Sequence, residues 1–185
     1  MTKLISITLF FIALTIVANA QLFSGKPDGT IISFYSKSPI EDIAATTKKA
    51  TVVLKTTTND IQFGIPMITF KFRKALMEEH FNEKYAESDK YPTCTFKGKI
   101  NEAIDYTKDG EYKASVKGTL NLHGVSKEIE AYGTITINGN SLTLVSTFKI
   151  RVADYNIKIP SLYVKNIAEI VDVNVNAVLE PFVKK

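Results

Sequence analysis

The clearest pattern in the sequence is a strict alternation of apolar and polar residues in the second half of the chain. Apolar or small side chains occupy every second position of the segments 112–122, 129–137 and 142–150, and polar side chains lie between them. A period of two predicts β-strands with one dry face and one wet face. Turn signals at 123–125 and 138–140 separate the three segments, which predicts two successive hairpins.

Shorter segments with the same period complete a set of about eight predicted strands. They are 30–36, 51–58, 61–68, 93–101 and the closing segment 167–179. After Ile68 the apolar positions change parity, and we predict a β-bulge near Pro66, because one extra residue reverses the face on which later side chains point. The dry faces could be buried in a sandwich or in a closed barrel. Several strands of ten residues or more favour an extended barrel of tilted strands.

One segment of the second quarter does not fit the pattern of a strand. Met77, Phe81 and Tyr85 recur at a spacing of four, with acidic residues on the opposite side. This spacing predicts a short amphipathic helix of about two to three turns. A single helix among many strands needs a β-surface or a β-cavity to cover.

The inward positions of the predicted barrel carry both small and large side chains. The small ones are Gly118, Ala131, Gly133, Ser146 and Ala177, and the large ones include Phe34, Phe63, Met67, Phe96 and Phe148. Small residues could leave room for an apolar tunnel, or they could allow strands to coil closely around a filled core. Alternation alone is equally consistent with both interpretations, because every β-core requires it.

The first twenty residues have the pattern of a secretory signal peptide. Lys3 precedes an apolar run over 4–17, and the small residues Ala18 and Ala20 mark a cleavage site. The run is too short for a membrane span of about 20 residues, so we predict no stable membrane insertion. We therefore expect a signal peptide over 1–20, one domain over 21–185, and a periplasmic or secreted location after cleavage near Ala20. The single cysteine, Cys94, excludes an internal disulfide, which suits a bacterial periplasm.

Charge and candidate chemistry point to binding rather than catalysis. The 23 basic and 19 acidic residues are interspersed, which predicts no nucleic-acid interface. The two histidines, His80 and His123, have no second ligand at zinc spacing, so we predict no metal site and no cofactor. We interpret His80 as a packing residue of the helix, with an acid–base role as the alternative, and His123 as a turn residue. Arg151, Asp154 and Tyr155 could meet a polar headgroup or form an ordinary loop network.

Four segments together resemble the YceI-like family, over roughly 30–182. They are LMEEHFNEKYAESDKYPTCTFKGKI, GTLNLHGVSKEI, FKIRVADYNIKIP and EIVDVNVNAVLEPF. The resemblance implies an all-β fold, an extended eight-stranded antiparallel barrel similar to that of lipocalins, with one short amphipathic helix. It also implies an apolar tunnel that holds a polyisoprenoid, an isoprenoid quinone or another long amphiphile. The segment 38–47 is shorter than its histidine-containing counterpart in many members, so we expect a different barrel mouth.

We therefore predict an exported lipid-binding protein that is not an enzyme and that sequesters or carries a long-chain isoprenoid or other lipid. The alternatives are an enzyme that uses His80 as acid or base on a bound lipid, and a structural protein with a filled barrel. A homodimer could form through an edge near Pro66 or through the basic surface. The predicted lining consists of Phe34, Leu54, Phe63, Met67, Met77, Phe81, Phe96, Val116, Leu120, Ile135, Phe148 and Val173.

Overall fold

A computed structural model describes residues 22–38, 41–159 and 168–183 of the chain. The predicted signal peptide and its cleavage site lie outside these residues. No helix in the described part of the chain is long and apolar enough to span a membrane.

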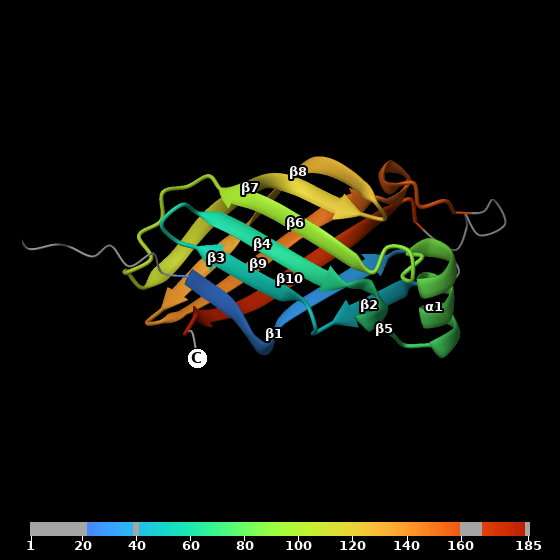
Figure 1. Ribbon diagram of the computed structural model, residues 1–185, viewed down its shortest axis with the longest axis horizontal. Helices are drawn as coiled ribbons and strands as arrows, with labels where there is room; N and C mark the ends of the chain where they lie inside the picture. The colour runs from blue at the N-terminus through green and yellow to red at the C-terminus, as the bar shows by residue number, and fades with distance from the viewer. Residues whose placement is uncertain (1–21, 39–40, 160–167, 184–185) are drawn as a thin grey trace, which may run out of the picture.

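The architecture is a closed antiparallel β-barrel of eight strands, as predicted. The strands are β1 (Leu22–Ser36), β3 (Thr51–Lys55), β4 (Asp60–Pro66), β6 (Thr93–Ile100), β7 (Gly110–Leu122), β8 (Val125–Asn138), β9 (Ser141–Arg151) and β10 (Ile170–Pro181). Neighbours in the barrel are neighbours in this series, and β10 closes the ring by pairing with β1. The strands run obliquely along an elongated barrel, with the helix α1 (Ala75–His80) at one end and the end of β10 at the other (Figure 1). We call these the helix end and the hairpin end, because the β8–β9 hairpin also lies at the second.

The two ends of β1 pair with different strands. Its first residues, Leu22–Ser24, pair with β3, whereas its last residues, Ile32–Ser36, pair with β2 (Ile43–Thr47). The two-residue strand β5 (Lys71–Phe72) adds to the free side of β2. These two extra strands extend the wall at the helix end, where the sequence pattern predicted no strand.

The predicted bulge near Pro66 is wrong. The strand β4 ends at Pro66, and the chain turns through a 3-10 helix, η1 (Met67–Thr69). The hydroxyl of Thr69 donates to the carbonyl oxygen of Pro66 at 2.6 Å and lies 2.7 Å from the hydroxyl of Thr47. The change of apolar parity therefore reflects a change of element. An irregularity does occur in β1, where the register against β10 shifts between Gly25, opposite Leu179, and Thr30, opposite Ala177.

The predicted helix is present at the helix end and is partly distorted. The α-helix α1 continues into a π-helical turn, η2 (Phe81–Tyr85), in which the N–H of Ala86 donates to the carbonyl of Phe81 at 2.7 Å. The Phe81 ring packs among the rings of Phe34, Phe70 and Phe72, with centroids 5.0–5.8 Å apart. This aromatic cluster anchors the helix to β1, β5 and the end of η1.

The hairpin end of the barrel is filled with side chains. Leu54 of β3, Leu142 of β9 and Leu179 of β10 are completely buried there, and Phe23 lies beside Leu54 in register. The loop between β6 and β7 covers this end, and its Tyr106 hydroxyl donates to the Asn59 side chain at 3.0 Å. Burial raises the pKa of Tyr106 to about 12. This end of the barrel is therefore a conventional packed core.

Candidate binding cavity

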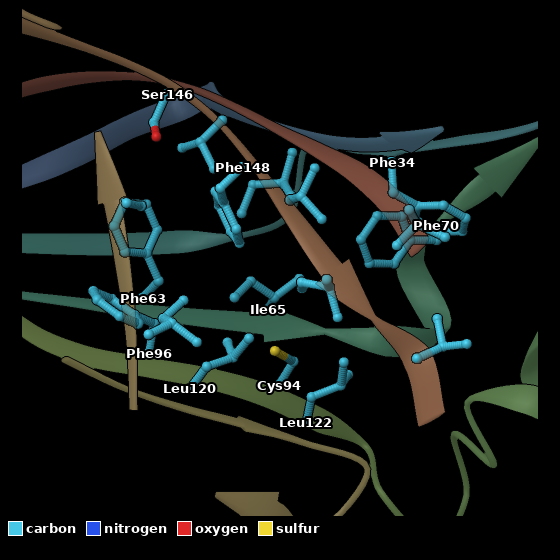
Figure 2. Close-up of a pocket in the computed structure, with 18 of the residues that line it drawn as sticks. Phe34, Phe63, Ile65, Phe70, Cys94, Phe96, Leu120, Leu122, Ser146 and Phe148 are labelled. Carbon is cyan, nitrogen blue, oxygen red and sulfur yellow. The ribbon is translucent and has the colours of Figure 1, made fainter. Parts of the chain in front are cut away.

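The other part of the barrel encloses a cavity of about 550 Å³. Its walls come from β1, β4 and β6 to β10, and α1 with its π-helical turn lies at one end of it. Figure 2 shows the rings of Phe63, Phe96 and Phe148 turned toward a common space, with Phe34 and Phe70 farther along it. Most of the lining side chains are apolar. A volume of this size is within the range of small-molecule sites in proteins.

The structure brings most of the predicted lining residues to the wall of this cavity. They are Phe34, Phe63, Met67, Met77, Phe81, Phe96, Val116, Leu120, Ile135, Phe148 and Val173. That these side chains contact a ligand stays a prediction.

Leu54 does not line the cavity. Its side chain points inward, as the alternation of β3 predicts, but β3 lies toward the hairpin end, where the barrel is packed solid. Period-two patterning identifies the face of a strand and says nothing about the position of a residue along the barrel axis.

The small inward residues divide between the two roles that the sequence left open. Gly118 lies against Gly98 of the neighbouring strand, and a Cβ on Gly118 would come within 2.4 Å of the Gly98 Cα. The Phe96 ring covers this glycine pair, so the small residues here permit close packing. Ala131 and Ser146, by contrast, line the cavity.

Polar side chains gather where the cavity meets the helix end. Glu41, His80 and Lys84 line it there, together with the phenylalanine cluster. Glu41 accepts hydrogen bonds from Lys74 at 2.7 Å and from Arg73 at 3.2 Å. These cations, Lys74 first, lower the pKa of the Glu41 carboxyl. The helix end therefore has a charged rim above an apolar interior.

His123 lies outside the cavity and makes contacts with three separate segments of the chain. It lies in the turn after β7 with a φ of 52°, which confirms the prediction that His123 is a turn residue. Its Nδ1 lies 3.0 Å from the carbonyl oxygen of Tyr155, and its Nε2 lies 2.7 Å from the Glu87 carboxylate. The ring also packs on Tyr91 with centroids 4.3 Å apart. His123 thus connects the β7–β8 turn with the segment after the helix and with the turn after β9.

The segment after β9 forms a network of its own. The 3-10 helix η3 (Val152–Tyr155) follows β9, and its Asp154 lies 3.8 Å from Lys127 of β8. Arg151 lies 3.9 Å from Glu169, and the Tyr155 side chain is buried. These pairings support the loop-network interpretation of 151–155 over a headgroup site.

The single cysteine of the chain lies in an apolar environment. Cys94 is buried on the cavity wall, and burial raises the pKa of its thiol to about 12. Such a thiol behaves as a small apolar side chain. Within the described ranges, no cluster of three or more His, Cys, Asp or Glu residues could hold a metal ion.

Comparison with known proteins identifies relatives of this fold. A sequence model of the YceI-like domain matches residues 23–179. A polyisoprenoid-binding domain from Saccharophagus degradans superposes with a TM-score of 0.76 at 16% identity, covering 86% of this chain and 98% of that one. BcnA from Burkholderia cenocepacia superposes with a TM-score of 0.71 at 18% identity, covering 83% and 98%. A YCEI protein from Campylobacter jejuni gives 0.60 at 18% identity, covering 80% and 90%. No curated protein matches the sequence significantly.

Proposed function

Because the chain belongs to the YceI-like family, we propose that it is a lipid-binding protein that holds a long-chain isoprenoid or a similar amphiphile inside the barrel. The observation that carries the proposal is the apolar cavity of about 550 Å³ between the packed hairpin end and the charged rim at the helix end. The description of the Saccharophagus degradans relative as a polyisoprenoid-binding domain supports the same ligand class.

Desolvation of the lipid chain would supply the affinity. Each methylene transferred from water into an apolar site contributes about 0.8 kcal/mol. About ten such groups would provide roughly 8 kcal/mol, equivalent to a micromolar Kd before the costs of immobilisation. No polar anchor is needed for binding of this strength, although the rim formed by Glu41, His80 and Lys84 lies where a headgroup could remain hydrated.

The proposed role is to sequester or carry the lipid outside the cytoplasm, without turnover. The apolar run over 4–17 and the small residues before Gln21 support export. The mass of the protein recovered from its native host tests this part, since a chain that begins at Gln21 is expected and an uncleaved chain would contradict export. Incubation of the loaded protein should return the lipid unchanged, and a chemically altered lipid would favour the enzymatic alternative with His80.

Native mass spectrometry of protein purified without detergent tests binding directly. We expect a discrete added mass that solvent extraction releases as a long-chain lipid, or uptake of added isoprenoid by the empty protein. Leu120→Glu and Phe148→Glu place a carboxylate on the cavity wall and should abolish retention. Thr119→Glu, on the exposed face next to Leu120, is the matched control and should retain the lipid. Folded wild-type protein that neither carries nor accepts an isoprenoid would refute the proposal, and the same spectra test the predicted homodimer.

A further inference from the structure

The barrel wall is open on one side, between β8 and β9. β8 pairs with β7 over Val125–Ile137, and β9 pairs with β10 over Leu142–Arg151. Between β8 and β9, however, the ladder covers only Gly133–Asn138 opposite Ser141–Ser146. The residues 125–132 of β8 and 147–151 of β9 therefore face each other without pairing, and we call this space the β8–β9 gap.

Specific residues define both limits of the gap. At its lower limit the two backbones approach so closely that a Cβ on Gly133 would lie 2.2 Å from the carbonyl oxygen of Val145. Next to this pair, the Ser146 hydroxyl donates to the carbonyl of Tyr132 at 2.7 Å. At the upper limit, the Lys127–Asp154 ion pair joins β8 to η3. The gap is thus a bounded window and is not the frayed end of a hairpin.

The cavity reaches this window and continues to the outside. Its lining includes the inward residues Ala131 and Phe148, and it also includes the outward residues Tyr132 and Val145. Side chains from both faces can line one space only where that space passes through the wall. On the outer surface, Tyr132 is 66% exposed and Val145 is 46% exposed, so one aromatic and one aliphatic side chain border the window. On the inner side, the residue of β8 next to the closed limit is the small Ala131.

We propose that the β8–β9 gap is the portal through which the isoprenoid chain enters and leaves the cavity, with Tyr132 and Val145 as its first contacts outside the barrel. This inference rests on the proposed function. A side portal lets a chain slide in lengthwise between two strands, past the Tyr132 ring and the Val145 side chain and onto the apolar lining, with Glu130 and Lys149 on the outer edges of the gap. The helix end requires the chain to pass the charged rim at Glu41 and Lys84, and the phenylalanine cluster anchors the helix there.

A covalent bridge across the gap tests the portal. Glu130 of β8 and Lys149 of β9 are exposed and would be opposite each other if the ladder continued beyond Gly133 and Ser146. The double variant Glu130→Cys with Lys149→Cys is joined by a short flexible bis-maleimide. The control, Glu130→Cys with Lys117→Cys, is joined by the same reagent across the intact β7–β8 ladder, where these two residues are register partners. Buried Cys94 should stay unmodified, and the intact mass verifies one bridge per chain.

The readout is the kinetics of binding of anthraniloyl-labelled geranylgeraniol. The bridge lies outside the cavity, so association and dissociation rates should both fall by about tenfold or more while their ratio, the Kd, stays unchanged. The β7–β8 bridge should alter neither rate. Without any bridge, Val145→Glu should slow uptake, because it places a charge at the outer side of the window.

The outcomes separate the two proposals. Unchanged rates with the gap bridged would overturn the portal and place the route at the helix end. An unchanged uptake rate in Val145→Glu would overturn it as well if the bridge fails to form. Failure of the unmodified protein to bind the probe would overturn the lipid-binding proposal and the portal with it.

Discussion

The division of the barrel into a packed end and a hollow end predicts different consequences for two leucine truncations. Leu54 is completely buried at the hairpin end, whereas Leu120 is 5% exposed and borders the cavity. Leu54→Ala creates a new void among tightly packed neighbours, so both the transfer term and the cavity term apply. We expect it to lower the free energy of unfolding by about 3–4 kcal/mol.

Leu120→Ala enlarges a space that already exists. Only the transfer term of the removed groups should remain, about 2 kcal/mol. For ligand affinity the order of the two variants should be reversed, with the larger loss in Leu120→Ala. The reason is that Leu120 would contact the bound chain and Leu54 would not. We expect Leu120→Ala to weaken isoprenoid binding by about fivefold, equivalent to roughly 1 kcal/mol. Leu54→Ala should leave the affinity unchanged.

Urea unfolding of the delipidated protein, followed by far-UV circular dichroism, measures the stability of each variant. Tryptophan fluorescence offers no alternative, because the chain has no Trp. Lipid must be removed first, since a ligand that binds the folded state adds its own binding free energy. Equal losses of stability, or a loss of affinity in Leu54→Ala as large as that in Leu120→Ala, would refute the division into two ends.

Three further predictions concern single positions. The buried Thr30 hydroxyl has no hydrogen-bond partner among the described residues. Thr30→Val should therefore raise the free energy of unfolding by about 1 kcal/mol. A lower free energy of unfolding in urea would show that the hydroxyl is hydrogen-bonded in the folded protein. With its pKa raised to about 12, Cys94 should have a thiolate fraction of about 10⁻⁴ at pH 8. Its reaction with a disulfide reagent should therefore accelerate about tenfold per pH unit up to pH 10. Rapid labelling of the native protein at pH 8 would contradict the raised pKa. Gly133→Ala places a Cβ 2.2 Å from a backbone oxygen and should lower the free energy of unfolding by roughly 2 kcal/mol or more. The control Gly64→Ala, whose Cβ meets one hydroxyl oxygen at 3.0 Å, should lower it by less. Equal thermal stability of the two variants would disprove the close approach at Gly133.

Alternation predicted the direction of side chains well and their depth poorly. Phe63 and Leu120 lie on the cavity wall as expected, because the face of a strand follows directly from a period of two. Leu54 has the same inward direction and lies in the packed end. Depth along the axis depends on how neighbouring strands are staggered, and nothing in a single strand's sequence encodes that stagger.

Elements that depend on distant partners were also beyond the sequence pattern. The strand β2 forms because β1 leaves β3 and offers its edge to Ile43–Thr47, a segment with little alternation of its own. The β8–β9 gap has no signature in β8, because the alternation of that strand continues through Tyr132 while β7 alone supports it. The helix was predicted because the spacing of its apolar residues is a local pattern. The same spacing did not predict the π-helical turn at the end of the helix.

The pairing of β1 with β10 determines when the barrel can first exist. It joins the first described strand to the last one, a contact between residues more than a hundred positions apart, and contacts of this kind form late and slowly. A chain made from its N-terminus onward cannot close the wall until the residues of β10 are available. Until then β1 and β9 each present an unpaired edge, the kind of surface from which aggregation starts. The interior therefore comes into being in a single late step, and a lipid must find its way into a finished barrel, because the growing chain has no enclosed space in which to trap one.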